Sequence, residues 1–263
     1  MQYCRFQTED GPQYGQVGLR DGELWMERVI AAPPEDWSVV GLRRDVPAQP
    51  LSELKLLAPV TPSKIVCIGR NYRDHAAELG NEVPKEPLLF LKAPSAIVAP
   101  GATIRIPALS HRVDFEGELG VVIGRACHKL GPQEDVRPYI RGYTIVNDVT
   151  ARDLQKSDGQ WSRAKGFDTF CPVGPIVSGG LDLDAGVSVT TRLNGEVKQH
   201  GSTKDLIFDI ATLLRYISAA MTLNPGDLIA TGTPAGVGPM YPGDVVEVEI
   251  DGLGVLRNPV AAE

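Results

Sequence analysis

Short apolar runs separated by turn residues follow one another through most of this 263-residue chain. Asp21-Gly22, Asn194-Gly195 and Asp251-Gly252 each lie between two such runs, and these residue pairs favour the tight turns of β-hairpins. One long helix is indicated over residues 205–221, where apolar residues recur at helical spacing. Many short strands with few helices predict an α+β, β-rich fold on a strongly curved or closed sheet.

A polar, proline-bearing stretch separates the first strands from the rest of the chain. APPEDWSVVGLRRDVPAQP and then LLAPVTPSK interrupt the strand pattern before residue 64. Clusters of this kind are typical of linkers and domain boundaries. We therefore expect a small N-terminal β-rich domain with its linker over residues 1–60 and a second, larger domain over residues 61–263.

Charge and cysteine usage exclude several classes of protein. A formal net charge of −7 argues against nucleic acid as a partner. The sequence has neither an apolar membrane span nor a secretion signal in MQYCRFQTED, so we expect a cytoplasmic protein without a membrane partner. Cys4, Cys67, Cys127 and Cys171 form no CxxC pair, which indicates reduced core residues rather than zinc ligands or disulfides.

Two glutamates lie two residues apart inside the apolar run VDFEGELGVVIG, residues 113–124. If this run is one strand, Glu116 and Glu118 point to the same face. Two like charges at that spacing need a cation, a shared proton or open water when they are partly buried. The alternative is the solvated face of a half-exposed strand.

A third carboxylate, Asp148, follows the predicted buried strand YTIVN and precedes the predicted helix TARDLQ. Side chains at strand ends are often presented to a site, although Asp148 could instead be the N-cap of the helix. Three carboxylates without a nearby His or Cys suit a hard divalent ion, Mg²⁺ or Mn²⁺. The sequence therefore predicts a metal that holds the glutamates together.

Three further segments contain candidate polar groups. NYRDHAAEL predicts a short helix capped by Asn71, with His75 and Glu78 on one face, where the carboxylate could orient the ring. Lys165 would be a cation for an acidic substrate if it points inward. The alternative for all three side chains is exposure to solvent. The loop over residues 230–244 lacks the ending of a phosphate-binding loop, so its hydroxyls and amides could at most hold a carboxylate.

An ordered set of motifs resembles the fumarylacetoacetate hydrolase family. The motifs are KIVCIGRNYRDHAAEL, PLLFLKAPSA, VDFEGELGVVIG, GYTIVNDVTARDLQ, RAKGFDTFCPVGP, LNGEVKQ and ATGTPAGVG. They cover essentially everything from residue 60 to the end. The chain is most similar to short two-domain bacterial members described as 2-hydroxyhepta-2,4-diene-1,7-dioate isomerases or as 5-oxopent-3-ene-1,2,5-tricarboxylate decarboxylases.

The resemblance implies a metal centre and a catalytic dyad. Its metal ligands would be Glu116, Glu118 and Asp148. The dyad that activates water or moves a proton would be His75 and Glu78. The family fold is a β-rich roll around the metal, usually in a homodimer, so residues 61–263 would form the catalytic domain.

The resemblance also implies residues that face the substrate. Lys165 would face it directly, Arg152 and Gln155 would contact its oxo-acid end, and Thr233 would lie on its side of the site. One departure is Gly117, where a bulkier residue is common. This glycine leaves the ligands in place but could loosen the strand.

From these residues we expect an Mg²⁺- or Mn²⁺-dependent enzyme acting on small 2-oxo or 2-hydroxy-dienoate diacids. A metal-stabilised enolate would make it an isomerase or a decarboxylase in aromatic-compound catabolism. Within the family, the alternative is an acylpyruvate or fumarylpyruvate hydrolase that breaks a C–C bond. From another class, the alternative is a non-catalytic ligand-binding protein with a structural cation site.

Overall fold

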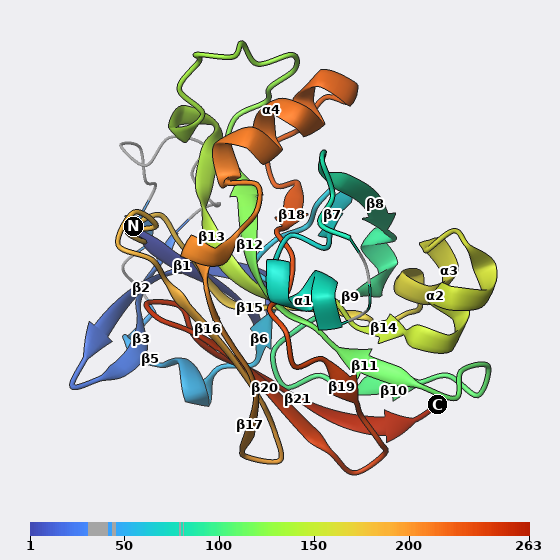
Figure 1. The fold of residues 1–263 in the computed structure, drawn as a ribbon. Coiled ribbons are helices and arrows are strands. Elements are labelled where there is room, and N and C mark those ends of the chain that lie inside the picture. Colours follow the sequence, from blue (N-terminus) through green and yellow to red (C-terminus); the bar gives the residue numbers. More distant parts are fainter. Residues whose placement is uncertain (31–41, 44–45, 79, 81) are drawn as a thin grey trace.

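The structure, a computed structural model, describes residues 1–30, 42–43, 46–78, 80 and 82–263 (Figure 1). Its largest sheet has the main strand order β4-β3-β2-β1-β15-β13-β12-β18-β7-β8. In that order the strands are β4 (Leu42–Arg43), β3 (Glu23–Ile30), β2 (Gly11–Arg20), β1 (Gln2–Thr8), β15 (Cys171–Ser178), β13 (Ile140–Asn147), β12 (Gly117–Ile123), β18 (Leu228–Ala230), β7 (Ile65–Gly69) and β8 (Leu88–Lys92). Three short strands pair alongside: β5 (Gln49–Pro50), β6 (Leu56–Leu57) and β9 (Ile97–Val98).

Two smaller sheets and several helices complete the fold. The second sheet has the order β10 (Ile104–Ile106), β21 (Gly254–Ala262), β20 (Val245–Ile250), β16 (Ser188–Leu193) and β17 (Glu196–Ser202). The third has the order β14 (Thr150–Ala151), β11 (Val113–Phe115) and β19 (Gly238–Pro239). The α-helices among the described residues are α1 (Arg73–Glu78), α2 (Arg152–Asp158), α3 (Ser162–Gly166) and α4 (Ile210–Ala220). Short 3₁₀ turns occur at Leu51–Glu53, Pro94–Ala96, Arg137–Tyr139 and Thr203–Asp205.

The core lies on both faces of strand β12. Leu119 packs in one cluster with Val189 and Val248 of the second sheet. Val121 points to the same face as Leu119 and packs further along the strand with residues of α4, including Leu213. Val122 points to the opposite face, in a cluster with residues of β7 and β15. Figure 1 shows α4 against the end of β12 and β13 that lies away from the second sheet. A strand buried on both faces gives its side chains fixed positions, which suits it to present a site.

The predicted β-rich α+β fold is confirmed, with a small N-terminal β domain beside the larger one. Strand β1 joins the two parts, since Gln2 pairs with Ser178 of β15. Residues 32–41 and 44–45 of the predicted linker lie outside the described residues, and the boundary at residue 60 stays a prediction. None of the helices in the described chain is long and apolar enough to cross a membrane.

Several local predictions are confirmed. Asp21 and Gly22 have φ angles of 50° and 85°, and Asn194 and Gly195 have 53° and 82°, as tight two-residue hairpins require. The four cysteines are free and buried, so the prediction of reduced core residues holds.

Other local predictions are wrong. The long helix begins only at Ile210, because the Asp209 side chain accepts a hydrogen bond from the Thr212 backbone N–H and caps it there. Asn71 does not cap α1, which begins at Arg73. Instead its Nδ2 donates to the backbone carbonyls of Phe208 and Thr231, and its Oδ1 accepts from the N–H of Phe208.

Candidate active site

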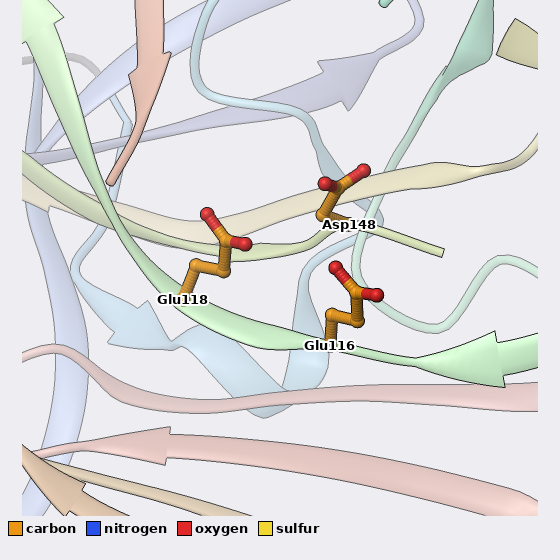
Figure 2. Close-up of side chains that lie close together, drawn as sticks. All are labelled: Glu116, Glu118 and Asp148. Carbon is orange, nitrogen blue, oxygen red and sulfur yellow. The ribbon is translucent and has the colours of Figure 1, made fainter. Parts of the chain in front are cut away.

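Three carboxylates lie close together (Figure 2). Glu116 lies between β11 and β12, Glu118 lies on β12, and Asp148 directly follows β13. One oxygen from each lies within 4.8 Å of those of the other two, and all three residues are buried. The alternative of a solvated strand face is therefore wrong, because Glu116 is 4 % exposed and Glu118 is 2 % exposed.

An interruption of the strand at Glu116 creates this arrangement. The single strand predicted over residues 113–124 is instead two strands in different sheets, β11 and β12. At the break the Glu116 N–H donates to Asn147 Oδ1 at 2.9 Å, and the Asp148 N–H donates to the Glu116 carbonyl at 2.8 Å. These bonds join the segment of two carboxylates directly to the segment of the third.

Asp148 does not serve as a helix cap. The N-cap position of α2 is Ala151, without a side-chain cap, so that alternative is excluded. The Asp148 carboxylate instead accepts hydrogen bonds from two buried lysines. Lys92 Nζ donates to Oδ1 at 2.7 Å, and Lys165 Nζ donates to Oδ2 at 2.6 Å.

Glu116 lies between two cations. Lys165 Nζ donates to its Oε2 at 2.8 Å, and Arg152 Nη2 donates to its Oε1. Burial alone would raise the pKa of Glu116, but Lys165, Arg152 and His75 nearby hold that pKa below its usual range. Lys165 therefore points inward, as its predicted role requires, and bridges two of the carboxylates.

Among the three carboxylates, Glu118 is the one that forms no ion pair with a side-chain cation of the described residues. Its Oε2 accepts from the backbone N–H of Gly232 at 2.8 Å. No donor within the described residues reaches its Oε1. Burial, with Asp148 and Glu116 close by, raises the pKa of Glu118 well above its usual range. Three buried oxygen donors, one of them uncompensated, fit a divalent ion such as Mg²⁺ or Mn²⁺.

The His75–Glu78 pair lies beside the carboxylates. His75 Nδ1 lies 3.3 Å from Glu78 Oε2, and Glu78 in turn accepts from the backbone N–H of Gly236 at 3.1 Å. His75 is 5 % exposed and lines the same cavity as Glu116, Glu118 and Asp148. The alternative of an exposed helix face is therefore wrong for His75, whereas Glu78 remains partly accessible.

The predicted substrate-facing residues line this cavity as well. Arg152 Nε donates to Asp114 at 2.9 Å and its Nη1 donates to Gln155 Oε1 at 2.7 Å, so the two residues are held together. Thr233 also lines the cavity. Its hydroxyl donates to the Gly117 carbonyl at 2.9 Å and accepts from Gln199 Nε2 at 2.7 Å, so it is already bonded on two sides.

Sequence reasoning missed two cations of the site. Lys92 ends the apolar strand β8 and is 2 % exposed, and a charge that closes an apolar run is the signal that could have found it. Arg70 follows β7, lines the cavity and has a φ of 58°, a left-handed conformation uncommon for arginine. Nothing in the local sequence marks that conformation.

Comparison with known proteins decides the family. Residues 64–261 match the model described as fumarylacetoacetate (FAA) hydrolase, C-terminal, and residues 1–59 match the model described as Rv2993c-like, N-terminal. This chain belongs to the fumarylacetoacetate hydrolase family. The resemblance seen in the sequence motifs is thereby confirmed.

Relatives in this family cover the chain at high identity. Protein Rv2993c of Mycobacterium tuberculosis is 55 % identical, over 99 % of this chain and 98 % of its own length. Oxaloacetate tautomerase YisK of Bacillus subtilis is 44 % identical, over 80 % of this chain and 75 % of its own length. The crystal structure of 2-hydroxyhepta-2,4-diene-1,7-dioate isomerase from Mycobacterium marinum covers 100 % of this chain and 99 % of its own, with a TM-score of 0.89 and 44 % identity.

Proposed function

We propose that this protein is a divalent-metal-dependent isomerase that catalyses keto–enol tautomerisation of small 2-oxo diacids. The observation that carries the proposal is the meeting of three buried carboxylates and the His75–Glu78 pair at one cavity. The names of two family relatives, an oxaloacetate tautomerase and a dienedioate isomerase, support the same type of reaction. Oxaloacetate is therefore the first substrate to test.

The dyad supplies the proton transfer that tautomerisation needs. In the neutral ring with its proton on Nδ1, that N–H would donate a hydrogen bond to Glu78, and Nε2 would keep the lone pair of a general base. Nε2 would take the proton from C3 of the oxo acid while the electron pair moves to the C2 oxygen. Proton return to the oxygen gives the enol. A bound divalent ion would supply a Lewis acid that stabilises the developing negative charge on that oxygen.

The same site could support two related reactions. Decarboxylation passes through the same enolate and needs no water, whereas acylpyruvate hydrolysis needs His75 and Glu78 to position a water molecule. Tautomerisation uses the dyad as a proton carrier and needs no bound water, so it employs both the carboxylates and the dyad. We therefore keep decarboxylation as the second activity and hydrolysis as the alternative. A homodimeric, cytoplasmic protein remains our expectation.

A second carboxylate on the substrate would find a free cation in the cavity. The other cations of the site already have carboxylate partners, which are Glu116 and Asp148 for Lys165, Asp148 for Lys92, and Asp114 and Glu116 for Arg152. In the described part of the chain, Arg70 has no ion pair and no side-chain hydrogen bond. A half-buried guanidinium in this position favours a diacid over a monoacid.

The test of the proposed function is a substrate panel. Oxaloacetate, a 2-hydroxy-dienedioate and an acylpyruvate are followed by ultraviolet absorbance with Mg²⁺ or with chelator. We expect tautomerisation of oxaloacetate that chelator abolishes and Mg²⁺ restores. Turnover of the acylpyruvate alone would favour the hydrolase. If Mg²⁺ binds and no compound of the panel is turned over, the site belongs to a ligand-binding protein with a structural cation.

Arg70→Gln should lower the activity toward diacids and leave the activity toward monoacids nearly unchanged. Loss of one charged hydrogen-bonding partner should lower kcat/KM for oxaloacetate by about 10- to 100-fold, mainly through KM. For 2-oxobutanoate, which has a methyl group in place of the second carboxylate, the rate should stay nearly unchanged. Deuterium exchange at C3, measured by NMR, reports both substrates. Arg73→Gln, at an exposed arginine on α1, is the matched control. Equal losses for both substrates would contradict the role of Arg70.

A further inference from the structure

Gly117, the residue between the two glutamate ligands, pairs with Asn147 of β13 on one side and lies beyond the end of β18 on the other. Strand β12 pairs with β18 only over Gly120–Val122, so β18 offers no backbone partner to Gly117. Side chains from elsewhere satisfy that residue instead. The Gly117 N–H donates to Gln199 Oε1 at 3.0 Å, and the Gly117 carbonyl accepts from Thr233 Oγ1 at 2.9 Å.

Gln199 closes this arrangement into a ring. It lies on β17 of the second sheet and is fully buried. Its Nε2 donates to Thr233 Oγ1 at 2.7 Å and to the Pro234 carbonyl at 2.8 Å. The carboxamide thus uses its oxygen and both of its N–H groups. Because the N–H of Gly117 needs an acceptor, the carboxamide oxygen must face Gly117, and this fixes which way the amide is turned. A buried carboxamide satisfied on every side is a rigid connection.

The second sheet also packs directly on Gly117. A Cβ atom added there would lie 2.2 Å from Thr191 Oγ1 and 2.9 Å from Val248 Cγ1, both closer than real contacts allow. The expectation that this glycine loosens the strand is therefore wrong. Its small size permits the close approach, and its N–H and C=O are both bonded.

The loop that Gln199 holds also reaches the other parts of the site. Gly232, next to Thr233, donates its N–H to Glu118, and Gly236, two residues after Pro234, donates its N–H to Glu78. The Gln199 side chain is therefore hydrogen-bonded both to Gly117, between the two glutamates, and to the loop whose Gly236 supports Glu78.

We propose that Gln199 is a positioning residue that sets the geometry of the Glu116–Glu118 metal site through Gly117 and Thr233. This inference rests on the proposed function, because it assumes that the carboxylates bind a divalent ion. Residues that orient metal ligands without touching the metal typically contribute about 10- to 100-fold to metal affinity.

The test measures the affinity of Mg²⁺ alone by calorimetry in Gln199→Met and Gln199→Glu. Methionine keeps the length of the side chain and loses all three hydrogen bonds. Glutamate keeps an acceptor for the Gly117 N–H and, when ionised, loses both donors. The matched control is Asn258→Leu. Asn258 is 1 % exposed, donates to the carbonyls of Ala99 and Ala102, and does not line the cavity.

We expect the affinity for Mg²⁺ to fall about 10- to 100-fold in Gln199→Met and by less in Gln199→Glu. Asn258→Leu should lower the melting temperature to a similar extent and bind Mg²⁺ like the wild type. If Gln199→Met does not fold, Gln199→Glu decides the question by the same comparison. Wild-type affinity in the Gln199 variants, or an equal loss in the control, would overturn this inference alone. A wild-type protein that binds no Mg²⁺ would overturn the proposed function and this inference with it.

Discussion

His75→Ala should slow tautomerisation of oxaloacetate by about 10²–10⁴-fold while the protein still binds Mg²⁺. The substitution removes the general base and leaves the three carboxylates with their bonds to Lys92, Lys165 and Gly232. The loss should appear in kcat, and extra Mg²⁺ should not restore it. Calorimetry of Mg²⁺ binding beside a tautomerisation assay measures both quantities on one sample.

The control for this substitution is Arg73→Ala, an exposed position on the same helix, which should keep the wild-type rate. Near-normal turnover in His75→Ala would mean that the dyad is only a polar helix face. The site would then need nothing beyond stabilisation of an enolate, and simple decarboxylation would become the better account of its chemistry.

Glu118→Gln should weaken Mg²⁺ binding by at least about 100-fold without lowering the stability of the metal-free protein. Burial beside Asp148 and Glu116, without an ion pair of its own, disfavours the charged form of Glu118 in the metal-free protein, so a neutral amide at this position is tolerated. The amide oxygen can still accept from the N–H of Gly232. Turnover should be low and should partly recover as the Mg²⁺ concentration is raised.

Glu116→Gln separates the loss of a metal ligand from the effect on the stability of the metal-free protein. It also removes a metal ligand, but it takes the charged partner away from Lys165 and Arg152, which are both buried. Removing one member of a buried ion pair is strongly destabilising. The melting temperature of metal-free protein should therefore fall in Glu116→Gln and not in Glu118→Gln. Equal melting temperatures of the two variants would contradict a stabilising role for the ion pairs of Glu116 with Lys165 and Arg152.

The local sequence was sufficient to select the three carboxylates and the dyad as candidates. Glu116 and Glu118 interrupt an apolar run, Asp148 follows a predicted buried strand, and His75 and Glu78 share a helix face. Such features depend on short periodicities, which a single sequence displays. The resemblance of the motifs to the family then predicted the overall fold.

The connections between these residues could not be predicted, because their partners lie far away along the chain. Lys92 bonds to Asp148 across 56 residues, and Gln199 bonds to Gly117 across 82. The break at Glu116 was missed for a related reason. The alternation in VDFEGELG is the same for one strand and for two, and the bond from Glu116 to the Asn147 side chain is a tertiary contact.

A crystal of the protein grown with Mn²⁺ and oxalate, analysed by anomalous scattering, tests the central claim most directly. We expect a single strong anomalous peak with oxygens of Glu116, Glu118 and Asp148 within about 2.0–2.6 Å of it, and oxalate on its open side. An anomalous peak at other residues, in a crystal of protein that turns over oxaloacetate, would contradict the assignment of these carboxylates as the metal site.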